Sequence, residues 1–77
     1  MNNYLKQTKK AISGVTGIDP SEVKGTDQLE GDLNVGNLEL VEILENLEEE
    51  FTVELMEEKD KLEVVSDLVD LLTEKLE

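Results

Sequence analysis

The most constraining feature of this sequence is the segment 32–51, DLNVGNLELVEILENLEEEF, in which a glycine-containing turn precedes a strongly acidic amphipathic helix. Because successive helical residues are separated by about 100°, one wide face of this helix carries only apolar side chains. That face comprises Leu40, Ile43, Leu44, Leu47 and Phe51, with Val41 at its edge. The remaining arc carries Glu39, Glu42, Glu45, Asn46, Glu48, Glu49 and Glu50. The pattern predicts a helix that buries one side and presents a dense row of carboxylates to water.

Three residues at the start of this helix have distinct expected roles. Gly36 is expected to adopt a turn conformation closed to other residues, and Asn37 is among the best N-caps. Leu38 lies at the centre of the acidic arc, where it cannot join the apolar face of its own helix. It is either an ordinary exposed leucine, which is common in proteins, or a contact point for a partner whose approach is oriented by the surrounding charge.

Two further long helices are predicted on either side of this segment. The first covers residues 2–13 and is expected to end at Gly14. Leu5, Ile12 and either Thr8 or Lys9 lie on its inner side. The last covers residues 62–75 and has the clearest periodicity in the chain. Its apolar residues Leu62, Val65, Val69, Leu72 and Leu76 recur at alternating spacings of three and four, and Val64, Leu68 and Leu71 widen the face.

The connections between these helices are predicted to be a long loop and a short helical turn. In residues 15–32, glycines interrupt any helical period, while Asp19 and Pro20 are typical of the start of a short turn. The apolar residues Ile18, Val23, Leu29 and Leu33 should anchor this loop on the body of the protein. Residues 52–55 should form an extended connection with Val53 and Leu55 pointing inward, and residues 57–61 a brief helical turn. The predicted fold is an all-α four-helix bundle with a short third helix, formed as a single domain over residues 1–77.

Composition restricts the function. The chain has neither cysteine nor histidine, so thiolate zinc sites and most nucleophilic and acid–base chemistry lack their usual residues. A net charge of −13 on 77 residues disfavours nucleic acid and anionic membranes as partners and favours basic protein surfaces. No apolar run is long enough to span a bilayer, and the amino end lacks the apolar core of a signal peptide. We therefore expect a cytoplasmic monomer that is not an enzyme.

The carboxylates suggest no dedicated metal or catalytic site. Asp32, Asn34 and Gly36 occupy alternate positions, as the first ligands of a calcium loop would. The twelfth position of such a loop, where a bidentate glutamate is required, is Ile43, and the glycine expected at the sixth is Asn37. Weak binding of divalent cations by the clustered carboxylates remains open. The helix glutamates are expected to form a solvated face and not an acid–base pair, since no pocket perturbs them.

The segment resembles the signature of acyl carrier and peptidyl carrier proteins, in which an Asp-Leu-Gly-x-Asp-Ser-Leu turn precedes an acidic helix. Here the turn reads Asp32-Leu33-Asn34-Val35-Gly36-Asn37-Leu38, and the helix ends in Glu48-Glu49-Glu50-Phe51. The likeness covers nearly the whole chain, because residues 19–23 and 62–72 also match family-like positions. In that family the serine of the motif carries 4′-phosphopantetheine, whose thiol holds an acyl chain as a thioester. Asn37 stands at that position here, and Gly36 replaces the aspartate before it.

The resemblance implies the carrier fold, a link to fatty acid biosynthesis, and partners that handle acyl or peptidyl thioesters. It also implies that the chain carries no phosphopantetheine, because attachment requires an oxygen nucleophile and Asn37 offers an amide. The leucine after the modified serine contacts partner enzymes in the family, so Leu38 is expected to do so here. The partner-binding set is Leu38, Glu39, Val41, Glu42, Glu45 and Glu49. The alternative is a divergent carrier-fold interaction module unrelated to acyl transfer.

The charge predicts that salt stabilises the folded chain. Raising the ionic strength from 0.01 to 0.15 M shortens the Debye length from about 30 to about 8 Å, which screens repulsion among the acidic side chains. The urea midpoint at neutral pH should therefore rise with sodium chloride, measured by circular dichroism. A midpoint that is unchanged by salt would show that charge repulsion does not limit stability.

Overall fold

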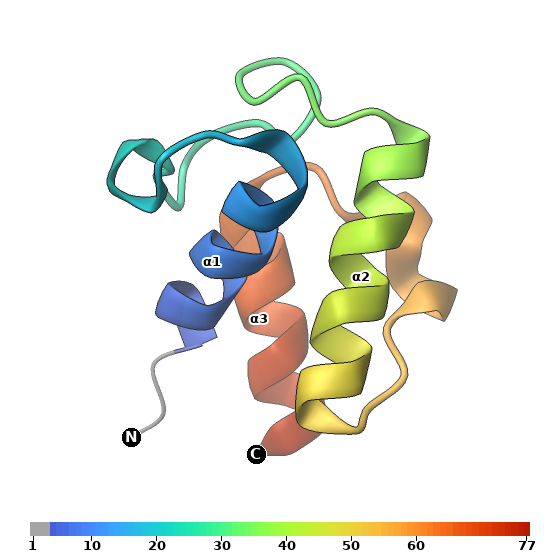
Figure 1. The fold of residues 1–77 in the computed structure, drawn as a ribbon. Coiled ribbons are helices and arrows are strands. Elements are labelled where there is room, and N and C mark those ends of the chain that lie inside the picture. Colours follow the sequence, from blue (N-terminus) through green and yellow to red (C-terminus); the bar gives the residue numbers. More distant parts are fainter. Residues whose placement is uncertain (1–3) are drawn as a thin grey trace.

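The computed structural model describes residues 4–77, and all of their regular elements are helices (Figure 1). Three α-helices, α1 (Tyr4–Thr16), α2 (Asn37–Phe51) and α3 (Val65–Leu76), are joined by two 3₁₀ helices, η1 (Pro20–Glu22) and η2 (Met56–Lys61). The described part of the chain contains no strand, only one isolated antiparallel bridge between Gln28 and Val64. This confirms the predicted all-α bundle, in which η2 is the short third helix.

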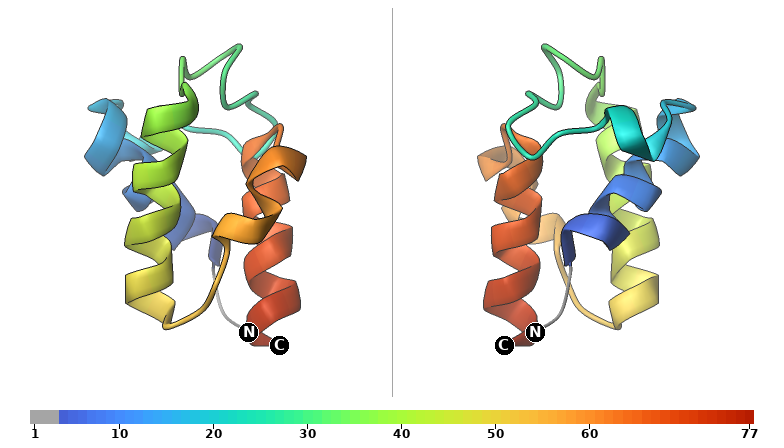
Figure 2. Two further views of the ribbon diagram at one scale, coloured as in Figure 1. Left: turned by 90° about the vertical axis from the view of Figure 1, so that its right-hand side faces the viewer. Right: turned by 90° about the vertical axis from the view of Figure 1, so that its left-hand side faces the viewer.

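The helices are arranged around α1. This helix crosses the molecule obliquely and packs against both α2 and α3 (Figure 2), while η2 lies beside α2 (Figure 1). The apolar faces meet in one core, whose fully buried members are Ile12, Val23, Ile43, Leu44, Leu47, Leu55, Val65, Leu68 and Leu72. An edge-to-face contact between Tyr4 and Phe51, with ring centroids 5.7 Å apart, extends the core toward the end of α2. None of the helices within residues 4–77 is long and apolar enough to cross a membrane.

Two predicted helix boundaries are wrong. Gly14 lies inside α1, and the helix ends before Gly17, which adopts a left-handed φ of 81° and donates its N–H to the Ser13 carbonyl at 2.8 Å. Such a left-handed glycine is a common helix terminator. Positions 2 and 3 of the predicted helix lie outside the described residues. The last helix begins at Val65 and not at Leu62, because the Asp67 carboxylate accepts the N–H groups of Glu63 and Val64 and caps the helix there.

The buried face of α1 also differs from the prediction. Ile12 and Thr8 are buried as expected, but Tyr4 shares their stripe, while Leu5 is only half-buried. The Thr8 hydroxyl is fully buried and has no hydrogen-bond partner among residues 4–77. Tyr4 donates its hydroxyl to the Glu77 carboxylate at 2.7 Å, which ties the start of α1 to the end of the chain. Amphipathic residues therefore replace aliphatic ones along this stripe.

The long loop between α1 and α2 packs on the body of the protein as predicted. Val23, Leu29 and Leu33 are buried, and Val35 joins them. Three backbone hydrogen bonds of 2.9–3.0 Å join the loop to the start of α3, from Leu29 to Glu63, from Val65 to Asp27 and from Ser66 to Gly25. These contacts hold the loop across the top of the bundle in Figure 1, next to the start of α2.

The predicted cap of the short turn in this loop is confirmed. Asp19 precedes Pro20 in η1, and its carboxylate accepts both the hydroxyl of Ser21 at 2.7 Å and the N–H of Ser21 at 2.9 Å. Both hydrogen bonds lower the pKa of the Asp19 carboxyl, and the bond from the Ser21 hydroxyl has the larger effect. Because the folded-state pKa is the lower one, the stabilisation is present above the unfolded-state pKa and is lost as the pH falls through the folded-state value.

Glu48 does not belong to the solvated acidic face to which the sequence assigned it. Its side chain turns toward η2, is half-buried, and accepts the backbone N–H groups of Leu55 at 2.7 Å and Met56 at 3.0 Å. Glu48 therefore supplies hydrogen bonds that the first residues of η2 cannot make within their own helix. The carboxylate holds the start of η2 against α2.

Replacing Glu48 should destabilise the protein although the change lowers its negative charge. Glu48→Ala leaves two partly buried N–H groups without an acceptor, which should cost about 1–3 kcal/mol of unfolding free energy. The exposed neighbour Glu49 provides the matched control. Glu49→Ala removes the same charge but breaks no hydrogen bond within residues 4–77, and it should change stability by less than about 0.5 kcal/mol. Urea unfolding of both variants gives the comparison. Equal stabilities would contradict a capping role for Glu48.

Candidate functional site

The start of α2 is formed by Gly36, which is the N-cap, and Asn37, which is the first helical residue. Gly36 has φ −82° and ψ −174°, a conformation that any residue can adopt, so the expected need for glycine backbone freedom is wrong. The Glu39 carboxylate reaches back to accept the Gly36 N–H at 3.0 Å. A Cβ atom at position 36 would lie 2.9 Å from that oxygen, but the oxygen ends a flexible side chain that can shift, so space does not require glycine either.

Leu38 is the one large apolar side chain that stands out on the surface of the described residues, with 75% of its area exposed. Its position confirms that it cannot join the core. Glu42, Glu45 and Glu49 are also exposed, and they follow Leu38 at spacings of four, three and four residues. Residues so spaced share one side of a helix, so these four side chains form a single outer stripe along α2. We refer to Leu38, Glu42, Glu45 and Glu49 as the outer stripe.

The two remaining members of the predicted partner-binding set lie beside this stripe and are less accessible. Val41 is half-buried at the edge of the apolar face. Glu39 is also half-buried, because its carboxylate is engaged with the Gly36 N–H. The structure therefore brings four of the six predicted residues together in the outer stripe, leaves Val41 and Glu39 at its sides, and gives Glu39 a capping role that the sequence analysis missed.

A groove of about 470 Å³ opens beside Asn37, between the long loop, the start of α2 and the end of η2. Leu29, Val35, Leu40 and Leu62 form its apolar lining. Its polar lining includes Glu30, Asn37, Lys59, Asp60 and Glu63. The groove thus combines apolar walls with several charged groups and lies directly next to the position of the carrier motif.

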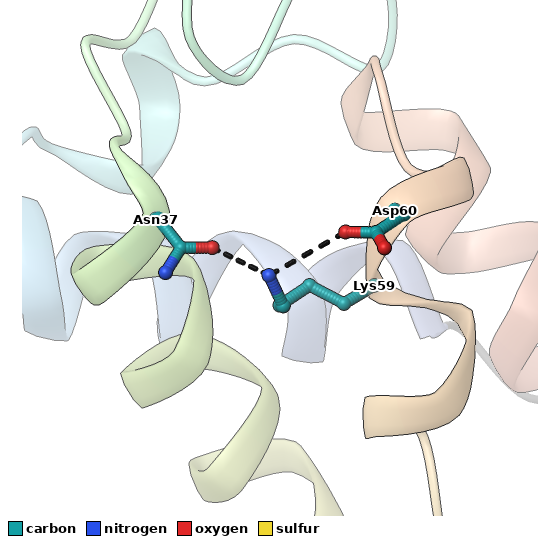
Figure 3. A network of polar contacts seen from close by, with 3 residues as sticks. All are labelled: Asn37, Lys59 and Asp60. Carbon is teal, nitrogen blue, oxygen red and sulfur yellow. Dashed lines mark hydrogen bonds and ion pairs between the residues drawn. The ribbon is translucent and has the colours of Figure 1, made fainter.

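Asn37 and Lys59 face each other across this groove. The Lys59 ammonium donates a hydrogen bond to the Asn37 side-chain oxygen and lies 3.5 Å from the Asp60 carboxylate, as Figure 3 shows. The contact joins the first residue of α2 to η2, 22 positions further along the chain. No local sequence pattern indicates it, because it depends on how η2 folds back along α2.

The residues that suggested a calcium loop serve the local fold. The Asp32 carboxylate accepts the Gln28 N–H at 2.7 Å, and Asn34 adopts a left-handed φ of 57°. Within residues 4–77, no group of three or more acidic side chains is arranged to hold a metal ion.

Known proteins resemble this chain over almost its full length, although no model of a known protein family matches it. It is 36% identical over 76 residues to an acyl carrier protein of Thermosynechococcus vestitus. The aligned region covers 97% of this chain and 94% of that protein. It is 33% identical over 76 residues to an acyl carrier protein of Buchnera aphidicola, covering 97% and 96%. The chain belongs to the acyl carrier protein family. Members of this family are carriers and not enzymes, which confirms that expectation for the chain.

Proposed function

We propose that this protein is an acyl-carrier-like docking module that cannot itself carry 4′-phosphopantetheine. In this proposal the outer stripe of α2 binds basic surfaces of enzymes that handle acyl or peptidyl thioesters. The observation that carries the proposal is the combination of an exposed Leu38 with three exposed glutamates on one side of the helix, directly after Asn37.

The physical basis of docking is complementarity of charge and shape. Carboxylates in a row attract a basic surface at long range and raise the association rate, whereas an exposed leucine gains binding energy only on burial in an apolar pocket. The outer stripe offers both features along one helix. Its glutamates are exposed and form no hydrogen bond or ion pair with side chains of residues 4–77, so they are available to a partner.

The chemistry at Asn37 supports the absence of the arm. Attachment forms a phosphate ester with a side-chain hydroxyl, and the Asn37 amide has no such oxygen nucleophile. The serine hydroxyls lie elsewhere: the Ser13 oxygen is buried, the Ser21 hydroxyl donates to Asp19 at η1, and Ser66 is in α3. None of the three lies at the start of α2.

Restoring the hydroxyl should restore modification. Wild-type protein incubated with coenzyme A and a broad-specificity phosphopantetheinyl transferase should keep its mass, whereas Asn37→Ser should gain the mass of one phosphopantetheine, measured by intact mass spectrometry. Modification of the wild type would refute the proposed lack of an arm. If Asn37→Ser stays unmodified, Gly36→Asp is added; this change also requires Glu39 to move, since a Cβ at position 36 would lie 2.9 Å from its oxygen. An inert double variant would show that the docking surface has diverged as well.

The outer stripe can be tested in the same assay. In the Asn37→Ser background, Leu38→Ala or Glu45→Gln should lower the kcat/KM of the transferase by about three- to tenfold, because about 0.7–1.4 kcal/mol of docking energy is lost. Glu50→Gln is the control, since this exposed glutamate carries the same charge but lies on another side of α2. Equal effects at positions 45 and 50 would show that overall charge, and not the outer stripe, determines docking.

A further inference from the structure

The outward face of α1 is basic, in contrast to the rest of the chain. Lys6, Lys10 and Gly14 are exposed and follow one another at four-residue spacing, so they share one side of the helix. The half-buried Lys9 lies beside them, and α1 contains no acidic residue. The Lys10 side chain forms no hydrogen bond or ion pair within residues 4–77. We refer to Lys6, Lys10 and Gly14 as the basic stripe.

The fold itself does not explain the glycine in this stripe. Gly14 lies inside α1, where glycine is less favourable than alanine because its backbone loses more freedom on folding. Beyond its chain neighbours and its own helix backbone, a Cβ atom there would meet no heavy atom of the described residues within 4 Å. Gly14 therefore leaves a bare stretch of helix surface beside the lysines, which a second helix can approach closely.

The outer stripe of α2 has the complementary charge. Helix α2 contains six glutamates and no basic residue, whereas α1 contains three lysines and no acidic residue. Two copies that met through the same helix would therefore bring like charges together, which is unfavourable. Only a contact between α1 of one copy and α2 of another pairs opposite charges, so the attractive arrangement is head-to-tail.

The spacings of the two stripes also match. Each helix rises about 1.5 Å per residue, so an antiparallel pair that places Leu38 opposite Gly14 also places Glu42 opposite Lys10. The second glutamate of the outer stripe then lies within one residue of the position opposite the first lysine of the basic stripe. In this register the exposed leucine covers the bare glycine, and two carboxylates face two ammonium groups.

We propose that the basic stripe binds the outer stripe of a second copy of this chain, with α1 of one molecule antiparallel to α2 of the next. The net charge of −13 on each copy opposes the approach, but at about 0.15 M salt the Debye length of about 8 Å screens the more distant charges. We expect a dissociation constant on the order of 1 mM, so that the dilute protein is monomeric. The contact does not depend on the proposed function, since no enzyme takes part in it.

Self-association can be measured on the full-length ¹⁵N-labelled protein in about 0.15 M sodium chloride, at protein concentrations from about 0.1 to about 2 mM. The translational diffusion coefficient should fall with concentration, and the backbone amide signals of Lys10, Gly14 and Glu42 should shift together. Diffusion and shifts that do not change over this range would overturn the proposal. If a glutamate-rich peptide shifts the α1 amides while the copies do not associate, the basic stripe binds a different acidic partner and the second copy is wrong.

Exchange of charges tests the pairing of the two stripes. Lys10→Glu and Glu42→Lys should each weaken association about tenfold or more, whereas the double variant, which keeps the wild-type net charge, should recover it. Lys75→Glu and Glu50→Lys are the matched controls, because they make the same changes in charge at exposed positions outside both stripes. If Lys75→Glu weakens association as much as Lys10→Glu does, net charge governs association and the proposed contact is wrong.

Gly14→Ala separates association from folding. The urea midpoint should rise because alanine is the better helix former, while association should weaken about threefold or more because the added methyl group fills the space into which Leu38 packs. Gly25→Ala is the control, since its Cβ atom would also enter open space but lies in the loop. A Gly14→Ala variant that associates like the wild type would contradict the proposed register.

Discussion

Burial of the inner face of α2 is the constraint on which the rest of the structure depends. Ile43, Leu44 and Leu47 have no exposed area, and they pack in the core that α1, α3 and η2 complete. Burial of each such side chain contributes roughly 1.5–3 kcal/mol, which is a large part of the stability of so small a domain. Because this face must point inward, the outer stripe on the other side of the same helix must point outward. The same helix therefore supplies buried side chains that stabilise the fold and holds Leu38 exposed on the surface.

The second role of α2 is to position η2. Glu48 holds the start of η2 through two backbone N–H groups, and Asn37 contacts Lys59 nearer its end. The two contacts lie at opposite ends of α2, so η2 runs back along it (Figure 1). This arrangement forms one wall of the groove, while the long loop forms another. The side-chain contact between Asn37 and Lys59 joins the start of α2 to η2 at this groove. We propose that Asn37 stands at the position of the family's modified serine.

The helices could be predicted from the sequence because their apolar residues recur with a clear helical period. The exposed position of Leu38 followed from the same period, and the cap at Asp19 followed from local turn chemistry. Helix ends were less predictable, since Gly14 and Gly17 are equally plausible terminators and only the backbone conformation distinguishes them. Glu48 was misassigned because helical periodicity places it on the polar arc but cannot reveal that η2 folds back to meet it. Lys59 was missed for the same reason, as its contact joins residues that only the tertiary fold brings together.

The mass of the protein isolated from the organism that makes it tests most directly whether Asn37 leaves this carrier fold without an arm. Intact mass spectrometry should show the mass of the unmodified polypeptide, with no fraction heavier by one phosphopantetheine. A species that carries this added mass would place the arm on another residue and contradict the proposal.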